Sequence, residues 1–123
     1  MPHKNPCRFW DAFDKRQLET LATYKADDDI DGDTITHAAL LALYQKDLDL
    51  LKSLDFYHRA LLELVARKPM MLKLLLSVLE ARHFPNPLPI YVPVTRENIT
   101  IFNSFFEKHG LDYCYLRSLS SER

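Results

Sequence analysis

Glycine is scarce in this sequence, with 2 residues among 123. The tight turns of β-sandwiches and barrels often need glycine, because it adopts positive φ angles without steric cost. The scarcity also leaves no glycine-rich loop that could cradle a phosphate, and the motifs Gly-x-Ser-x-Gly and His-Glu-x-x-His are missing. We therefore expect neither a β-rich fold nor an enzyme, and no cofactor or small-molecule substrate is indicated.

Cysteines and long apolar runs are few as well. Cys7 and Cys114 are too few for a disulfide framework, and the sequence starts without an apolar signal segment. No histidine or cysteine has the paired spacing that structural zinc requires. The most apolar run, Met70–Leu79, is interrupted by Lys73 and is too short to span a bilayer. We expect a reduced, cytoplasmic protein without a membrane partner.

The net charge is small, at −1, so no strong overall field favours nucleic acid or an acidic membrane. The charges are nevertheless unevenly distributed along the chain. Residues 1–57 contain 11 acidic and 7 basic residues, a balance of −4, whereas residues 58–123 contain 6 and 9, a balance of +3. The two halves could form one polarised surface or complementary parts of one fold.

Apolar residues recur three and four positions apart over most of the chain, which is typical of amphipathic helices. Five segments follow this pattern, namely residues 5–24, 36–54, 56–68, 70–82 and 96–109. For the last segment, Thr95 is the expected N-cap and Gly110 the expected residue after the C-terminus. We find no internal repeat in the sequence.

A proline-rich segment separates the fourth and fifth predicted helices, with four of the seven prolines within residues 85–93. Proline removes a backbone donor, so this segment is expected to be an extended arm rather than a helix or a central strand. The sequence therefore predicts an all-α, single-domain bundle over residues 1–123, with about five helices and a proline-rich extended arm. Residues 118–123 are expected to form a frayed tail.

Five aspartates lie within seven consecutive positions before the second predicted helix. Asp27, Asp29 and Asp31 match ligand positions 1, 3 and 5 of a calcium-binding EF-hand loop, and Gly32 matches position 6. Position 12 needs a bidentate glutamate, but Ala38 stands there. The three aspartates are therefore weak metal candidates only. An acidic turn in front of a helix N-terminus is the simpler interpretation.

The apolar surface of the helices is wide for a chain of this size. The fourth predicted helix is apolar nearly all round, and the chain has 14 aromatic residues. Surface of this kind often marks an interface, and methionine adapts well to different partners. We therefore predict a small interaction or regulatory module that docks a protein partner or self-associates. The predicted partner-binding residues are Leu61, Leu64, Met70, Met71, Leu74 and Leu75.

Basic residues on the third and fourth predicted helices support an alternative function. Some of them could share a face and contact DNA phosphates, as in dimeric transcriptional regulators. No helix-turn-helix signature is legible, because the glycine-containing turn is missing. The residues in this alternative are Arg59, Arg67, Lys68, Lys73 and Arg82.

Overall fold

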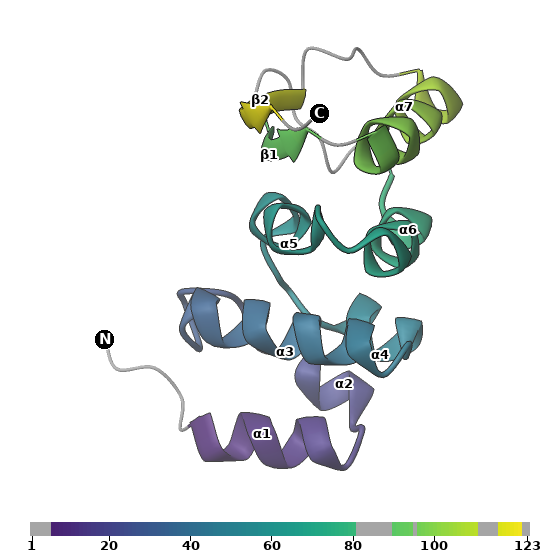
Figure 1. Cartoon of the computed structure of the whole chain (residues 1–123). Helices are drawn as coiled ribbons and strands as arrows, with labels where there is room; N and C mark the ends of the chain where they lie inside the picture. Colours follow the sequence, from purple (N-terminus) through teal and green to yellow (C-terminus); the bar gives the residue numbers. More distant parts are fainter. Residues whose placement is uncertain (1–5, 81–89, 95, 111–115, 122–123) are drawn as a thin grey trace. The chain divides into compact units, whose positions relative to one another are not determined.

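Helices make up most of the part of the chain that the structure, a computed structural model, describes: residues 6–80, 90–94, 96–110 and 116–121 (Figure 1). The predicted all-α class is confirmed. The helices are α1 (Pro6–Asp14), α2 (Leu18–Leu21), α3 (Gly32–Tyr44), α4 (Leu48–Ser53), α5 (His58–Val65), α6 (Pro69–Val78) and α7 (Arg96–His109). Two short parallel strands accompany them, β1 (Ile90–Val94) and β2 (Leu116–Ser121).

The chain divides into two compact units, and the boundary falls between Tyr57 and His58. This boundary coincides with the change in charge balance along the sequence. Unit 1 (residues 1–57) is the acidic half of the chain, and unit 2 (residues 58–123) is the basic half. A single domain over the whole chain stays a prediction, and each unit is described here by itself.

Unit 1 contains two helical hairpins, and the first of them turns at Arg16. The N–H of Gln17 donates to the carbonyl of Ala12 at 2.9 Å, and the N–H of Arg16 donates to that of Phe13 at 3.1 Å. Arg16 has a φ of 55°, in the left-handed region. These features together are the Schellman motif, which ends a helix by satisfying its last carbonyls. The motif separates α1 from α2.

The second hairpin, α3–α4, turns in the same way thirty residues later in the chain. The N–H of Asp47 donates to the carbonyl of Ala42 at 3.0 Å, and the N–H of Lys46 donates to that of Leu43 at 2.9 Å. Lys46 has a φ of 58°. The two hairpins of unit 1 thus share one turn geometry, although the sequence shows no repeat.

A pair of opposite charges joins the two turns of unit 1. The guanidinium of Arg16 donates to both carboxylate oxygens of Asp47, at 2.7 and 2.9 Å. Asp47 is also the N-cap of α4 and accepts from the N–H of Leu50 at 3.2 Å. The hydrogen bond from Arg16 is the main reason why the pKa of Asp47 lies below its usual value. The turn of one hairpin thus holds the start of the next hairpin's second helix.

The second helix of each hairpin buries a leucine at the same place, four residues after its N-cap position. Leu21, Leu51 and Leu72 occupy this place in α2, α4 and α6, and none of them has exposed surface. The leucine therefore anchors a short helix of four to ten residues. Such short helices are marginal alone and depend on packing.

Replacing Lys46 with glycine is expected to stabilise the chain slightly. A side chain in the left-handed region costs about 1 kcal/mol, whereas the added flexibility of an unfolded glycine costs about 0.5 kcal/mol. Lys46→Gly should therefore raise the free energy of unfolding by about 0.5 kcal/mol, as measured by urea denaturation.

The neighbouring residue provides a matched control, because Gln45 has an ordinary helical φ of −81°. Gln45→Gly is expected to lower the free energy of unfolding by about 0.5 kcal/mol, because glycine has more freedom to lose when the C-cap forms. Equal losses for both variants would contradict the left-handed conformation of Lys46.

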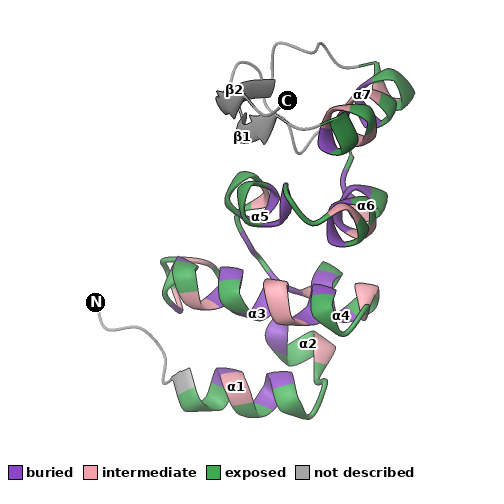
Figure 2. Cartoon of the chain, viewed as in Figure 1, coloured by how far each residue is buried: buried purple, intermediate pink, exposed green. Residues whose placement is uncertain are grey.

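Aromatic rings hold the helices of unit 1 together. Phe9 of α1 has no exposed surface, and its ring lies 5.4 Å from the ring of Tyr24 in an edge-to-face arrangement. Trp10 of α1 makes a similar contact with His37 of α3, at 6.1 Å between ring centroids. Such pairs add to the stabilisation from burial alone. In Figure 2, the buried residues accordingly form stripes along α1 and α3.

Unit 2 begins with the α5–α6 hairpin, against which α7 packs. α7 spans Arg96–His109, the range that the sequence predicts, whereas Thr95 lies outside the described residues. Its buried side chains include Phe102 and Phe106, whose ring centroids lie 5.9 Å apart. Asn98 is buried as well, and its side-chain amide donates to the carbonyl of Ala66 at 3.3 Å. This bond ties α7 to the turn between α5 and α6.

The proline-rich arm falls largely on residues 81–89, which lie outside the described residues. Its last part, Ile90–Val94, forms strand β1, which pairs in parallel with β2. The register shifts between Val92 and Pro93, which is where a proline interrupts the ladder. β2 spans Leu116–Ser121, and the frayed tail expected over residues 118–123 stays a prediction.

Candidate interaction groove

The aspartate run of unit 1 forms a turn in which the carboxylates bind backbone N–H groups. Asp27 has a φ of 66° and accepts from the N–H of Gly32 at 2.8 Å. Its other carboxylate oxygen accepts from the hydroxyl of Tyr57. Asp29 accepts from the N–H of Lys25 at 2.9 Å. Two of the three metal candidates therefore already use their oxygens to hold the turn.

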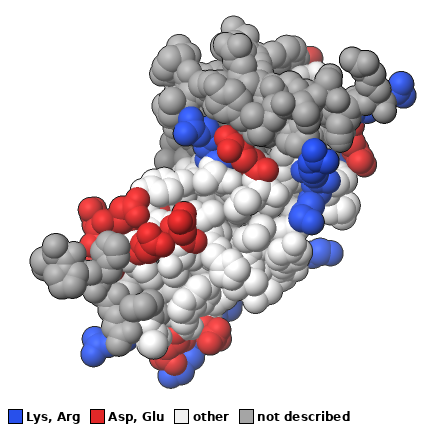
Figure 3. Space-filling model, turned by 60° about the vertical axis from the view of Figure 1, so that its left-hand side comes forward, with Lys and Arg blue, Asp and Glu red and all other residues white. Residues whose placement is uncertain are grey.

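Asp31 occupies the N-cap position of α3, although its side chain makes no capping bond. Within the described residues, no group of three or more acidic, histidine or cysteine side chains is arranged to hold a metal ion. The hydrogen bond to Asp27 is the main cause that raises the pKa of the Tyr57 hydroxyl above its usual value. The bonds of Asp27 and Asp29 to backbone N–H groups favour an acidic turn over a calcium site. Figure 3 shows that acidic side chains gather in patches on this face of the molecule.

The predicted partner-binding residues of unit 2 divide into buried and exposed ones. Leu61 and Leu75 have no exposed surface, and Met71 is only 8% exposed. These three side chains belong to the core, because they occupy the inward stripe of α5 and α6. They cannot form a docking surface, which corrects that part of the prediction. The remaining three are accessible: Leu64 and Met70 are 55% and 65% exposed, and Leu74 is partly exposed.

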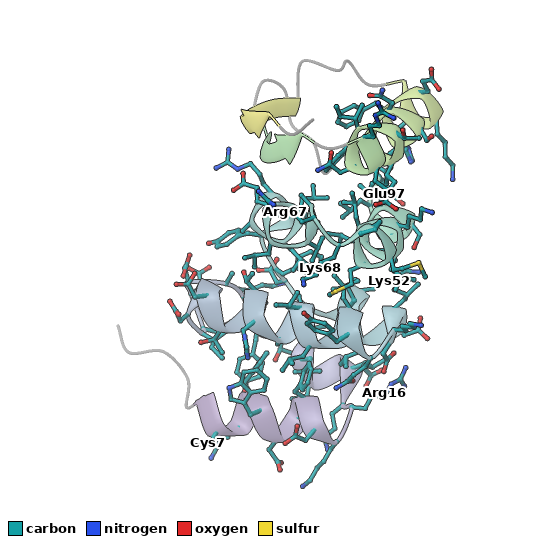
Figure 4. All side chains as sticks on the ribbon, viewed as in Figure 1. Cys7, Arg16, Lys52, Arg67, Lys68 and Glu97 are labelled. Atoms are coloured by element: carbon teal, nitrogen blue, oxygen red, sulfur yellow. The ribbon has the colours of Figure 1, made fainter. Side chains whose placement is uncertain are left out.

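The predicted DNA-contacting residues do not come from one helix face. Arg59 lies on α5, whereas Arg67 and Lys68 lie in the turn before α6, as Figure 4 shows for the latter two. Lys73 lies on α6. These four residues are exposed, and Arg82 lies outside the described residues.

A groove between α6 and α7 of unit 2 has a volume of about 940 Å³. α7 provides most of its lining in steps of four residues, which is one stripe of a helix. This stripe is about 18 Å long, since a helix rises about 1.5 Å per residue. The lining residues are Lys73, Leu76 and Ser77 of α6 with Arg96, Glu97, Thr100, Ile101, Ser104, Phe105 and Lys108 of α7.

The groove combines an apolar floor with polar edges. Three apolar side chains line it: Leu76 and Phe105 are each 6% exposed, and Ile101 is partly exposed. Two lining hydroxyls donate to their own helices: Ser77 to the carbonyl of Leu74 at 2.6 Å and Thr100 to that of Arg96 at 2.9 Å. Their oxygens therefore retain lone pairs that accept hydrogen bonds from outside.

Four charged residues line the groove, three cations and one carboxylate. Lys73, Arg96 and Lys108 are exposed, and none of them forms an ion pair within the described part of the chain. Glu97 is the carboxylate, and Figure 4 shows it on the side of α7 that faces α6. The lining side chains thus carry a net positive charge.

Sequence reasoning missed the part of this groove that α7 provides. One signal was available, because Ile101 falls outside the apolar stripe of Ile99, Phe102, Phe105 and Phe106. An apolar residue beside the core stripe widens the apolar surface toward solvent. The sequence did not reveal that α6 and α7 pack together, so the neighbouring Lys73 could not be connected with Ile101.

Among the described helices, none is both long and apolar enough to cross a membrane. Comparison of the chain with protein-family models, curated proteins and solved structures found no match.

Proposed function

We propose that the chain is a small, non-enzymatic interaction module that binds a partner protein in the groove between α6 and α7. The observation that carries this proposal is an open groove with an apolar floor and cations at its edges that form no described ion pairs. Apolar surface with convergent polar groups is typical of binding sites. The proposal includes the cytoplasmic location expected from the sequence, and it moves the contact surface from residues of α5 and α6 to the groove between α6 and α7.

The groove can be tested by blocking its floor. Ile101→Glu introduces a charge where a partner would place apolar side chains, so it should abolish capture of the partner that the tagged wild-type chain retains. Leu64→Glu is a matched control, because Leu64 is an exposed apolar residue of unit 2 that does not line the groove. Quantitative mass spectrometry of the captured proteins measures the difference.

Two outcomes of this experiment would contradict the groove. If Ile101→Glu leaves capture of the partner unchanged, the groove is not the contact surface. If only Leu64→Glu abolishes capture, the result would instead favour the surface that the sequence predicted on α5 and α6. Circular dichroism of each variant establishes that the helices are retained.

DNA binding by a dimer remains the alternative proposal. It is favoured by the exposure of Arg59, Arg67, Lys68 and Lys73. It is weakened by the groove beside Lys73, whose carboxylate and apolar floor suit a phosphate backbone poorly. Retention on DNA that falls with salt and disappears in the variant Arg67→Glu with Lys68→Glu would support this alternative.

A further inference from the structure

We infer that the groove between α6 and α7 binds an acidic amphipathic helix of a partner protein. This inference rests on the proposed function and names the chemistry of the partner. Its basis is the charge of the groove together with the shape of its floor. Lys73, Arg96 and Lys108 provide three positive charges against the single carboxylate of Glu97.

The positions of these cations are not explained by the stability of their own helices. No acidic residue lies three or four positions from Lys73, Arg96 or Lys108 on the same helix, so none has the usual helical ion-pair partner. Arg96 also lies in the first turn of α7, where the helix dipole disfavours a cation. Lys108 alone gains from its place in the last turn. Carboxylates of a partner would compensate Lys73 and Arg96.

The length of the groove suits a helix of about three turns. The lining stripe of α7 runs from Arg96 to Lys108, which is about 18 Å at about 1.5 Å per residue. A partner helix that lies along it would place apolar side chains at positions i, i+3, i+4 and i+7 on the floor formed by Leu76, Ile101 and Phe105. Its flanking positions would then face the cations at the edges.

Other occupants fit these observations less well. Nucleic acid would place phosphates against Glu97 and leave the apolar floor unused. A cationic helix would meet three like charges. A second copy of this chain would bring the acidic run Asp27–Asp31 of its unit 1, which is a turn and not an amphipathic helix, so it would leave the apolar floor unused. The acidic amphipathic helix satisfies the cations and the floor together.

A designed peptide tests the inference directly. The probe is a fluorescent peptide of about 14 residues, long enough for the stripe at about 1.5 Å per residue, with leucine at the floor positions and glutamate elsewhere. A second peptide carries lysine in place of every glutamate. Fluorescence anisotropy should show that the acidic peptide binds the full chain at least about tenfold more tightly than the basic one, and less tightly as salt increases.

Charge reversal on the protein provides the matched comparison. Lys73→Glu with Lys108→Glu should weaken binding of the acidic peptide about tenfold, because two attractive contacts become repulsive. Lys25→Glu with Lys52→Glu makes the same change in net charge at exposed lysines of unit 1, which do not line the groove. This control variant should bind the peptide with less than about a twofold change.

Three results would overturn the inference. The first is that the acidic and the basic peptide bind equally tightly. The second is that Lys73→Glu with Lys108→Glu and Lys25→Glu with Lys52→Glu weaken binding of the acidic peptide equally. The third is light scattering that shows self-association lost with Lys73→Glu and Lys108→Glu, which would assign the groove to a second copy. The acidic peptide could fail to bind while Ile101→Glu still abolishes capture of a protein. In that case the proposed function of the groove stands, and only the inference of an acidic partner helix is wrong.

Discussion

Leu51→Ala is expected to lower the free energy of unfolding by about 3 kcal/mol, within the range for removing a buried leucine side chain. Leu51 has no exposed surface, and it lies four residues after the N-cap Asp47 of a six-residue helix. A helix this short does not hold its conformation alone, so losing the side chain also loosens the helix. Urea denaturation followed by circular dichroism measures the effect.

The adjacent residue separates burial from helix propensity. Lys52 is exposed on the same helix, and alanine is at least as good a helix former as lysine. Lys52→Ala should therefore change the free energy of unfolding by less than about 0.5 kcal/mol. A loss below about 1 kcal/mol for Leu51→Ala would show that this leucine does not anchor the hairpin.

The sequence predicted helices best where their ends carry recognisable residues. Arg96–His109 was predicted with the bounds that the structure has, because Thr95 and Gly110 mark its two ends. Gly110 does have the positive φ, 66°, that its place after a helix requires. Capping residues and the apolar stripe agreed there, so nothing competed with the local signal.

The breaks within the first two predicted helices could not be read from the sequence. Arg16 and Lys46 take the left-handed conformation that usually falls to glycine or asparagine. The apolar spacing also continues across both turns, which predicts unbroken helices over residues 5–24 and 36–54. The turns are set by packing of the buried leucines and by the bond between Arg16 and Asp47. Tertiary contacts therefore overrode the local preference.

The candidate site was only partly predictable for the same reason. Apolar periodicity selects residues that face inward as well as residues that bind partners, so it also selects Leu61 and Leu75, which are buried. Lys73 was selected for its charge, but its neighbours in space come from α7, some twenty residues or more along the chain. A groove between helices depends on their packing, which no spacing within one helix encodes.

Asp27→Ala is expected to lower the free energy of unfolding by about 2 kcal/mol. The change removes two hydrogen bonds, from the N–H of Gly32 and from the hydroxyl of Tyr57, each worth about 0.5–1 kcal/mol when partly exposed. The change also places alanine at a φ of 66°, a left-handed conformation that costs alanine more free energy than it costs aspartate. Asp27→Asn keeps one acceptor oxygen and the tolerance for this φ, so about 1 kcal/mol should be lost.

The neighbouring Asp28 is the matched control, since it is exposed and equally charged. Its side chain makes no described hydrogen bond, so Asp28→Ala should change stability by less than about 0.5 kcal/mol. A thermal or urea unfolding series of the three variants measures these differences. Equal losses for Asp27→Ala and Asp28→Ala would mean that removing negative charge, rather than these bonds, determines the effect.

The titration of Tyr57 reports on the same bond independently of stability. Asp27 raises the pKa of Tyr57 in the folded chain, so the stabilisation is present below the ordinary tyrosine pKa of about 10 and is lost as pH rises through the folded value. Asp27→Asn should lower this pKa toward the ordinary value, because the neutral amide is a weaker acceptor and adds no charge. NMR titration measures this pKa. If Asp27→Asn leaves the pKa of Tyr57 unchanged, the side chains of Asp27 and Tyr57 do not form the hydrogen bond. The aspartate run would then be held only by the bonds of Asp27 and Asp29 to backbone N–H groups.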